Sequence, residues 1–416
     1  MKQIVIEIFH GGDWHQVATY QNGASLSYNI DYVLAHMDDN APLARIGLNY
    51  PVNFSDYREN GWPPFLLDLL PAGAARQAWL KRIDLKDNES ADWPLLCFAA
   101  GNPPGNLRIA SAVNTEKIAH PGFSRDEIIE RNIDFIDYAE AAGAIIAGAS
   151  SVQGQAPKFL LIEDHNGRWH AEGALDDPQV KQHWLVKFPR GKTTADRTVL
   201  RNEAPYYEIA RAFGLRVAAP LEYRSDTLFI RRFDRWVNNG QVERFGLESM
   251  TSLCQKNTFG ARISNNEICA AVCRYTSQPL AELQEYFRRD ILNLALGNTD
   301  NHGRNTAVLK RQARIAVELS PLFDFAPMFL DPEGIPRMAR WDNEVPGRLP
   351  EWGLVAEAVA GQLIDKQELR IWIAAEAEKV ERLPEMMQVY GIDYEIIEKL
   401  ARRIDDLAVS LRECTP

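Results

Sequence analysis

LGNTDNHGRNTAVL, residues 296–309, is the most informative stretch of this 416-residue sequence. It places Asp300 and Asn305 in one short segment, with four residues between them. A short loop between a helix and a strand can direct both side chains into one cleft. Taken alone, a simple surface turn explains the stretch better, because Asn, Asp and Gly are common turn residues.

The spacing of Asp300 and Asn305 is also that of protein-kinase catalytic loops, D-x-x-x-x-N. In that pattern the Asp reaches the hydroxyl that accepts phosphate, and the Asn reaches a metal on the ATP phosphates. The segment LSPLFDFAP (319–327) adds Asp324 about one β-hairpin downstream, where kinases carry the metal-binding Asp of Asp-Phe-Gly. Mg²⁺ prefers such oxygen ligands together with phosphates. A turn or helix-cap role for Asp324 is then the minority alternative.

Two upstream features suit phosphate binding. Lys187 lies in the apolar stretch WLVKFP (184–189), and an unpaired lysine is costly to bury, so it needs an anion. Glu203, or less readily Glu208, could pair with it, and a solvated lysine on an edge strand is the alternative. The segment SSVQGQAPK (150–158) is not a Walker A sequence, but its small residues permit close backbone approach to phosphate.

The order of predicted elements indicates an α+β chain with a protein-kinase-like, two-lobed fold. Residues 1–110 predict a β-rich N-terminal module. Within it, residues 1–50 alternate like antiparallel strands, and residues 63–83 predict a helix that is interrupted or restarted near Pro71. GNPPG (101–105) predicts a turn at a subdomain edge.

Residues 111–245 predict a kinase small lobe with the phosphate loop and the ATP lysine. Ser124 and Glu127 form a capping box that predicts the start of a helix, and Gly214 predicts the end of another. Residues 246–416 predict a helical large lobe with the catalytic loop, apart from short strands at TAVLK and ARIAVEL. A nucleotide would bind in the cleft between the two lobes.

Composition indicates a cytoplasmic protein. The N-terminus lacks the long apolar core of a signal peptide, and no apolar run approaches the length of a membrane span. The net charge of −11 disfavours non-specific binding to DNA or to anionic membranes. The five cysteines are odd in number and scattered, which predicts reduced structural thiols. Cys269 and Cys273 lack a second Cys/His pair for zinc, so two core cysteines are the better explanation.

Taken together in chain order, these segments resemble the HipA family of bacterial kinase toxins over nearly the whole chain. The matching segments are LLPAG (69–73), SVQGQAPK (151–158), FIRRFDR (229–235), NTDNHGRN (298–305) and FDF (323–325). Three details depart from the family pattern. Ala72 replaces the usual Glu, Arg231 stands where an acidic residue is common, and the phosphate loop has Gln155 one place early.

The resemblance implies an ATP- and Mg²⁺-dependent serine/threonine kinase. It assigns Asp300 and His302 to catalysis, and Asn305 and Asp324 to Mg²⁺. It assigns six residues to ATP: Ser151, Val152, Gly154, Lys158, Lys187 and Phe233, the last of these near the adenine. Ser151 also matches the family's autophosphorylated serine, and Ser150 is the adjacent alternative.

The resemblance further implies partners. The protein substrate would be translation-related, such as an aminoacyl-tRNA synthetase, and a HipB-like helix-turn-helix antitoxin would neutralise the toxin. DNA would then be contacted only through the antitoxin. Two other functions stay open: a kinase of similar fold that acts on a small molecule or lipid, and an inactive nucleotide-binding co-repressor. The intact Lys, Asp, Asn, Asp set argues against the second.

Overall fold

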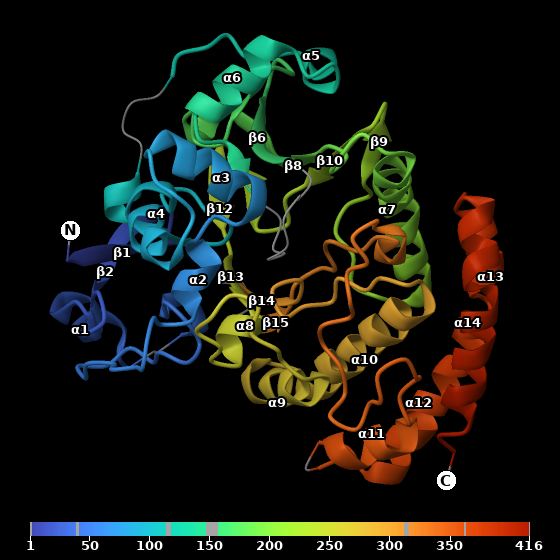
Figure 1. The fold of residues 1–416 in the computed structure, drawn as a ribbon. Coiled ribbons are helices and arrows are strands. Elements are labelled where there is room, and N and C mark those ends of the chain that lie inside the picture. The colour runs from blue at the N-terminus through green and yellow to red at the C-terminus, as the bar shows by residue number, and fades with distance from the viewer. Residues whose placement is uncertain are drawn as a thin grey trace. The chain divides into compact units, whose positions relative to one another are not determined.

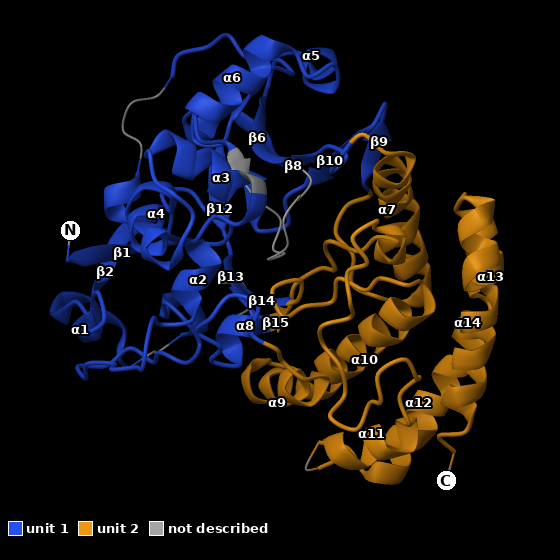
Figure 2. Ribbon diagram, viewed as in Figure 1, with its two compact units in different colours: residues 1–191, 221–261, 307–317 blue, residues 192–220, 262–306, 318–416 orange. Residues whose placement is uncertain are grey.

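The computed structural model describes residues 2–38, 41–113, 118–146, 157–311, 316–361 and 363–415. The chain divides into two compact units (Figure 2). Unit 1 comprises residues 1–191, 221–261 and 307–317, and unit 2 comprises residues 192–220, 262–306 and 318–416. Neither unit is one continuous segment, and the three-part division expected from the sequence stays a prediction. Figure 1 labels the helices and strands.

An antiparallel sheet with the strand order β3-β2-β1-β4 begins unit 1. Its strands are β1 (Gln3–His10), β2 (Asp13–Gln21), β3 (Ser25–Tyr28) and β4 (Leu107–Ile109). Alternation predicted β1, β2 and β3 correctly but not β4, and Ile4, Ile6 and Ile8 on one face of β1 are all buried. Four helices add side chains to the same core: α1 (Ile30–His36), α2 (Phe65–Leu69), α3 (Gly73–Arg82) and α4 (Asp92–Ala99). The helix predicted over 63–83 is present as α2 and α3, whereas α1 and α4 were not predicted.

A second sheet of unit 1 has the order β5-β6-β8-β10-β9, with β7 paired to β6. Its strands are β5 (Ile145–Ile146), β6 (Lys158–Asp164), β7 (Trp169–Ala171), β8 (Val180–Lys187), β9 (Glu222–Arg224) and β10 (Thr227–Arg231). Helices α5 (Arg125–Ile129) and α6 (Ile133–Ala141) precede it, and α5 begins with the predicted capping box of Ser124 and Glu127. Aromatic residues dominate the core that α6 shares with this sheet, including Phe135, Phe159 and Phe229.

The rest of unit 1 consists of short elements around residues 235–317. They are β11 (Arg235–Asn238), β12 (Gln241–Arg244), β13 (Gly246–Ser249), α8 (Met250–Leu253) and β14 (Ala307–Arg311). β11 pairs with β12, and β13 pairs with β14. The chain then passes to unit 2 within β15 (Ala316–Leu319).

Unit 2 is built mainly of helices. They are α7 (Thr194–Phe213), α9 (Asn265–Tyr275), α10 (Pro279–Ala295), α11 (Trp352–Val359), α12 (Lys366–Glu381), α13 (Leu383–Val389) and α14 (Tyr394–Arg412). α7 starts at a capping box of Thr193 and Asp196 and ends at Gly214, whose φ of 98° is the left-handed conformation that glycine adopts without strain. Pro279 at the first turn starts α10, where its missing N–H costs nothing.

Two further expectations concern the whole described chain. Within the described ranges, no helix combines the length and apolar character that crossing a membrane requires. All five cysteines are free thiols, and Cys97, Cys269 and Cys414 are buried.

Candidate active site

The predicted catalytic loop begins where α10 ends in unit 2. Gly297 follows the helix with a φ of +67°, and a Cβ added there would lie 2.6 Å from a ring carbon of Phe329. Only glycine fits this conformation and this close approach. The amide of Phe329 also donates to the carbonyl oxygen of Gly297 over 3.0 Å. The conformation of Gly297 therefore fixes the direction in which the loop leaves α10. The hydrogen bond from Phe329 joins the start of the loop to the segment that follows Asp324.

Asn305 is held in place by the backbone of the loop itself. Its amide N–H donates to the carbonyl oxygen of His302 over 2.8 Å, and its side-chain Nδ2 donates to the carbonyl oxygen of Asp300 over 2.7 Å. The other side-chain atom, Oδ1, is buried and has no hydrogen-bond partner in the described part of the chain. A buried, unpartnered carbonyl-type oxygen is costly, so it calls for a ligand such as a cation.

Asp300, His302 and Asp324 form one electrostatic group. Nε2 of His302 lies 3.5 Å from Oδ1 of Asp300, and neither ring nitrogen of His302 has a hydrogen-bond partner among the described residues. Burial lowers the pKa of His302, although the charges of Asp300 and Asp324 act in the opposite direction. A neutral imidazole therefore stands beside the two carboxylates at neutral pH.

Asp324 has a strained backbone. Its φ of 52° lies in the left-handed region, which non-glycine residues rarely adopt and which Asp tolerates better than most. The next residue, Phe325, is buried with 1% of its surface exposed and anchors the turn in the core of unit 2. Strain of this kind persists where the surrounding structure holds it, and it is concentrated at functional sites.

A buried ion network holds the strand that leads to Asp324. Arg216 donates to both carboxylate oxygens of Glu282, over 3.0 and 2.7 Å, and to the carbonyl oxygen of Leu319 over 2.6 Å. Arg289 donates to Glu285 over 2.8 Å and to the carbonyl oxygen of Ser320 over 2.6 Å. The sequence analysis missed this network, although a carboxylate pair and an arginine among the apolar residues of α10 were a usable signal.

Asn301, next to Asp300, fixes a further segment of unit 2. Its Nδ2 donates to the carbonyl oxygen of Ala339 over 2.9 Å, and its Oδ1 accepts from the amides of Met338 and Ala339 over 2.9 and 3.2 Å. This role could not be predicted from the sequence, because the partners lie almost forty positions away in the chain. The residue that follows Asp300 is thus tied to the backbone of residues 338 and 339.

In unit 1, two buried lysines oppose each other directly. Lys158 on β6 and Lys187 on β8 are paired residues of antiparallel strands, so their side chains lie on the same face of the sheet. They are 8% and 5% exposed, respectively. β8 lies between β6 and β10, so the edge-strand alternative for Lys187 is wrong. Two like charges at one buried position favour an anion beside them, and a phosphate group fits that need.

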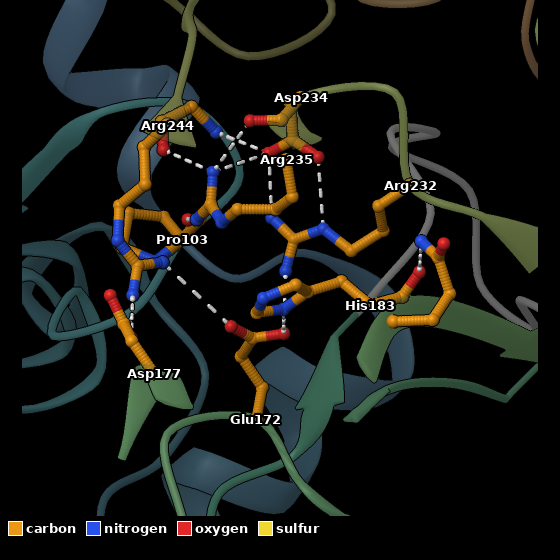
Figure 3. Close-up of polar contacts among 10 residues, drawn as sticks. Pro103, Glu172, Asp177, His183, Arg232, Asp234, Arg235 and Arg244 are labelled. Carbon is orange, nitrogen blue, oxygen red and sulfur yellow. Dashed lines mark hydrogen bonds and ion pairs between the residues drawn. The ribbon is translucent and has the colours of Figure 1, made fainter. Parts of the chain in front are cut away.

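Phe233, the predicted adenine neighbour, is half-buried. The residues on either side of it, Arg232 and Asp234, belong to a buried ion cluster of unit 1 (Figure 3). Arg232 donates to both oxygens of Asp234, over 2.9 and 2.6 Å, and to Glu172 over 3.0 Å. Burial alone would raise the pKa of Asp234, but Arg232 and Arg235 hold that pKa well below its usual range. The residues on both sides of Phe233 are therefore fixed, and the contribution of Glu172 was not foreseen from the sequence.

The same cluster reaches the Gly-Pro-rich turn before β4. The amide of Gly105 donates to Asp234 over 2.8 Å, and Arg235 donates to the carbonyl oxygens of Gly105 and Pro103 over 2.7 and 3.2 Å. The turn predicted as a subdomain edge is thus bonded to the segment that carries Phe233.

Several of the predicted assignments are not tested by the described part of the chain. Ser150, Ser151, Val152 and Gly154 lie outside the described residues, so their assignments stay predictions. Glu203, on α7 in unit 2, is 4% exposed. Glu208 is ion-paired with Arg211 at 3.2 Å. The identity of the glutamate that pairs with Lys187 stays a prediction.

The residues of the candidate site suit a Mg²⁺ ion that is held partly by phosphates and water better than a metal ion that is held by protein side chains alone. Across the described ranges, no group of three or more His, Cys, Asp or Glu side chains is arranged to hold a metal ion. Asn305 and Asp324 supply two oxygen-bearing side chains, and the Oδ1 of Asn305 is unpartnered. Mg²⁺ in nucleotide sites typically takes one or two side-chain oxygens and completes its shell with phosphates and water.

Two family models match the chain. The chain matches the family model of the HipA-like C-terminal domain over residues 150–400 and that of the HipA N-terminal domain over residues 16–110. No curated protein sequence matches the chain significantly.

The solved structures that are similar to the chain include the following two. One is HipA in the Shewanella oneidensis MR-1 toxin–antitoxin complex of HipA, HipB and operator DNA, with a TM-score of 0.69 and 17% identity over 99% of this chain and 97% of that chain. The other is the Helicobacter pylori proinflammatory kinase CtkA, with a TM-score of 0.39 and 15% identity over 61% of this chain and 96% of that chain. The first likeness shows the fold, and the second is too weak to carry an argument.

Proposed function

This chain belongs to the HipA family, and on that premise we propose that it is an ATP- and Mg²⁺-dependent serine/threonine protein kinase. The observation that carries the proposal is the state of Asn305. Its Nδ2 is occupied by the carbonyl oxygen of Asp300, while its Oδ1 is buried without a hydrogen-bond partner among the described residues. A side chain held in this way offers an oxygen to a cation beside the predicted catalytic base.

The proposed reaction joins the hydroxyl oxygen of the acceptor to the γ-phosphorus of ATP and breaks the bond from that phosphorus to the β–γ bridging oxygen. Asp300 orients the hydroxyl and takes its proton, and ADP leaves. Bound Mg²⁺ would neutralise and orient the phosphates. The neutral imidazole of His302 beside Asp300 leaves that carboxylate free to accept the proton. Lys158 and Lys187 would contribute positive charge to the triphosphate.

The substrate and the partners are also proposals. The family resemblance supports a translation-related protein, such as an aminoacyl-tRNA synthetase, as the acceptor. The similar HipA structure is a complex with HipB and operator DNA, which supports a HipB-like helix-turn-helix partner for this chain and an indirect contact with DNA. Such a toxin would act in the cytoplasm.

Transfer of labelled phosphate tests the function. The purified chain should move the γ-phosphoryl group of ATP to a protein acceptor in the presence of Mg²⁺, and Asp300→Ala should abolish the transfer with the fold intact. A removed catalytic residue costs several orders of magnitude in rate, roughly 10⁴-fold or more. If Asp300→Ala retains near-normal transfer, or if labelled phosphate moves only to metabolites, the proposal is wrong.

A further inference from the structure

Tyr206 lies completely buried in unit 2 and touches both segments of the candidate site. It is on α7, and 0% of its surface is exposed. Its hydroxyl donates to the carbonyl oxygen of Leu296 over 2.9 Å. Its ring contacts the ring of Phe325 at a centroid distance of 5.4 Å and an interplanar angle of 54°.

The two contacts of Tyr206 are made next to the two segments that carry the predicted metal ligands. Leu296 caps the C-terminus of α10, where backbone carbonyls have no partner within the helix, and the catalytic loop starts at the next residue. Phe325 directly follows Asp324, whose backbone is strained. One side chain therefore bonds the start of the loop that carries Asn305 and packs on the residue that anchors Asp324.

The hydroxyl of Tyr206 adds the hydrogen bond to Leu296 to what the ring provides. A phenylalanine would fill the same volume and make the same ring contact. Burial raises the pKa of Tyr206 well above its usual range, so the hydroxyl is a neutral donor at neutral pH. A further direct link between the two segments is the hydrogen bond from Phe329 to Gly297, which lies one residue beyond Leu296.

We propose that Tyr206 is a positioning residue that sets the spacing between Asn305 and Asp324, by joining the carbonyl of Leu296 to the ring of Phe325. The proposal rests on the proposed function, because the spacing matters only if both side chains serve one metal ion. Residues that orient metal ligands without touching the metal typically change metal affinity by about 10–100-fold when they are removed.

The chain offers a matched control in Tyr286. This residue of α10 is also buried, with 5% exposed, and its hydroxyl donates to Oδ1 of Asn265 over 2.9 Å. Tyr206→Phe and Tyr286→Phe each remove one buried hydroxyl hydrogen bond from unit 2. A merely structural role for Tyr206 therefore predicts the same behaviour for both variants.

Calorimetric titration of ADP into the full chain, with and without Mg²⁺, distinguishes a positioning role for Tyr206 from a merely structural one. Both variants should show a similar shift in the urea midpoint. Only Tyr206→Phe should lose about tenfold or more of the Mg²⁺-dependent gain in ADP affinity, with metal-free binding unchanged within about twofold. The amide of Phe329 should also exchange its hydrogen faster in Tyr206→Phe than in Tyr286→Phe.

Three results overturn the proposal, and they are distinguishable. If the wild-type chain shows no Mg²⁺-dependent gain, the proposed function fails and the role of Tyr206 fails with it. If the wild type shows the gain and both variants retain it equally, only the role of Tyr206 fails. If Tyr206→Phe unfolds, Tyr206→Met in the same titration decides, because an unchanged Mg²⁺-dependent gain in that variant also excludes the role.

Discussion

The side-chain amide of Asn305 donates to the carbonyl oxygen of Asp300 over 2.7 Å, so the two residues that define the loop are bonded to each other. This bond fixes which atom of Asn305 is left to face a ligand. It also turns a sequence spacing, which taken alone a simple turn would explain better, into a specific geometry. The predictions that follow depend on this geometry and on the paired lysines of unit 1.

Asn305→Ala should weaken Mg²⁺-dependent ATP binding by about 10–100-fold, because it removes the unpartnered Oδ1 and the support for the Asp300 backbone. Metal-free ATP binding should change little. Asn265→Ala is a suitable control, because Asn265 is also fully buried in unit 2 but bonds to Tyr286. Equal loss of Mg²⁺ dependence in both variants, measured by titration calorimetry, would contradict the metal assignment of Asn305.

Lys187→Met should weaken ATP binding by about 10–100-fold, the effect of losing one charged hydrogen bond to phosphate. Melting temperatures are compared with and without ATP, so that a change in the stability of the free protein is not counted as a change in ATP binding. Lys181→Met is the control on the same strand, since Lys181 is exposed and ion-paired with Glu163 at 2.7 Å. The lysine pair has no role in nucleotide binding if ATP raises the melting temperature of both variants equally.

His302 should make stability depend on pH. Because its pKa is lowered in the folded state, the unfolded chain binds the proton more readily below its usual pKa of about 6.5. The free energy of unfolding should therefore fall as pH drops from about 7.5 to 5.5, by up to about 1.4 kcal/mol per pH unit from this residue. Urea unfolding of His302→Gln should show a shallower fall, and identical slopes would contradict the lowered pKa.

Incubation with ATP and Mg²⁺ should place phosphate on Ser151. A phosphate there adds roughly −1.5 to −2 charge at neutral pH, which repels the ATP phosphates and lowers ATP affinity. Mass spectrometry of tryptic peptides should locate the site, with Ser150→Ala and Ser151→Ala distinguishing the two neighbours. Phosphate that appears only elsewhere, or a phosphorylated chain that binds ATP normally, would remove this mode of regulation.

Local patterns in the sequence predicted much of the fold. Period-two alternation located β1 to β3, the capping box at Ser124 located the start of α5, and Gly214 marked the end of α7. The prediction missed β13 at Gly246–Ser249, because this strand forms by pairing with β14, far along the chain.

The residues of the candidate site that lie close together in the sequence could be predicted. The residues whose roles depend on packing between distant segments could not. The spacing of Asp300 and Asn305 can be read directly from the sequence. The roles of Tyr206, Arg216 and Asn301 depend on contacts between segments that are distant in the chain, such as the bond from Tyr206 to Leu296. A single sequence without such contacts cannot separate these residues from ordinary core and surface positions.

A crystal structure of the chain with Mg²⁺ and a non-hydrolysable ATP analogue tests the central claim most directly. We expect Oδ1 of Asn305 and the carboxylate of Asp324 on the metal, at the roughly 2.1 Å typical of Mg²⁺–oxygen bonds. We also expect Asp300 facing the γ-phosphate and Lys187 on the phosphates. A structure with the nucleotide and metal bound, but with neither Asn305 nor Asp324 near the metal, would contradict the account.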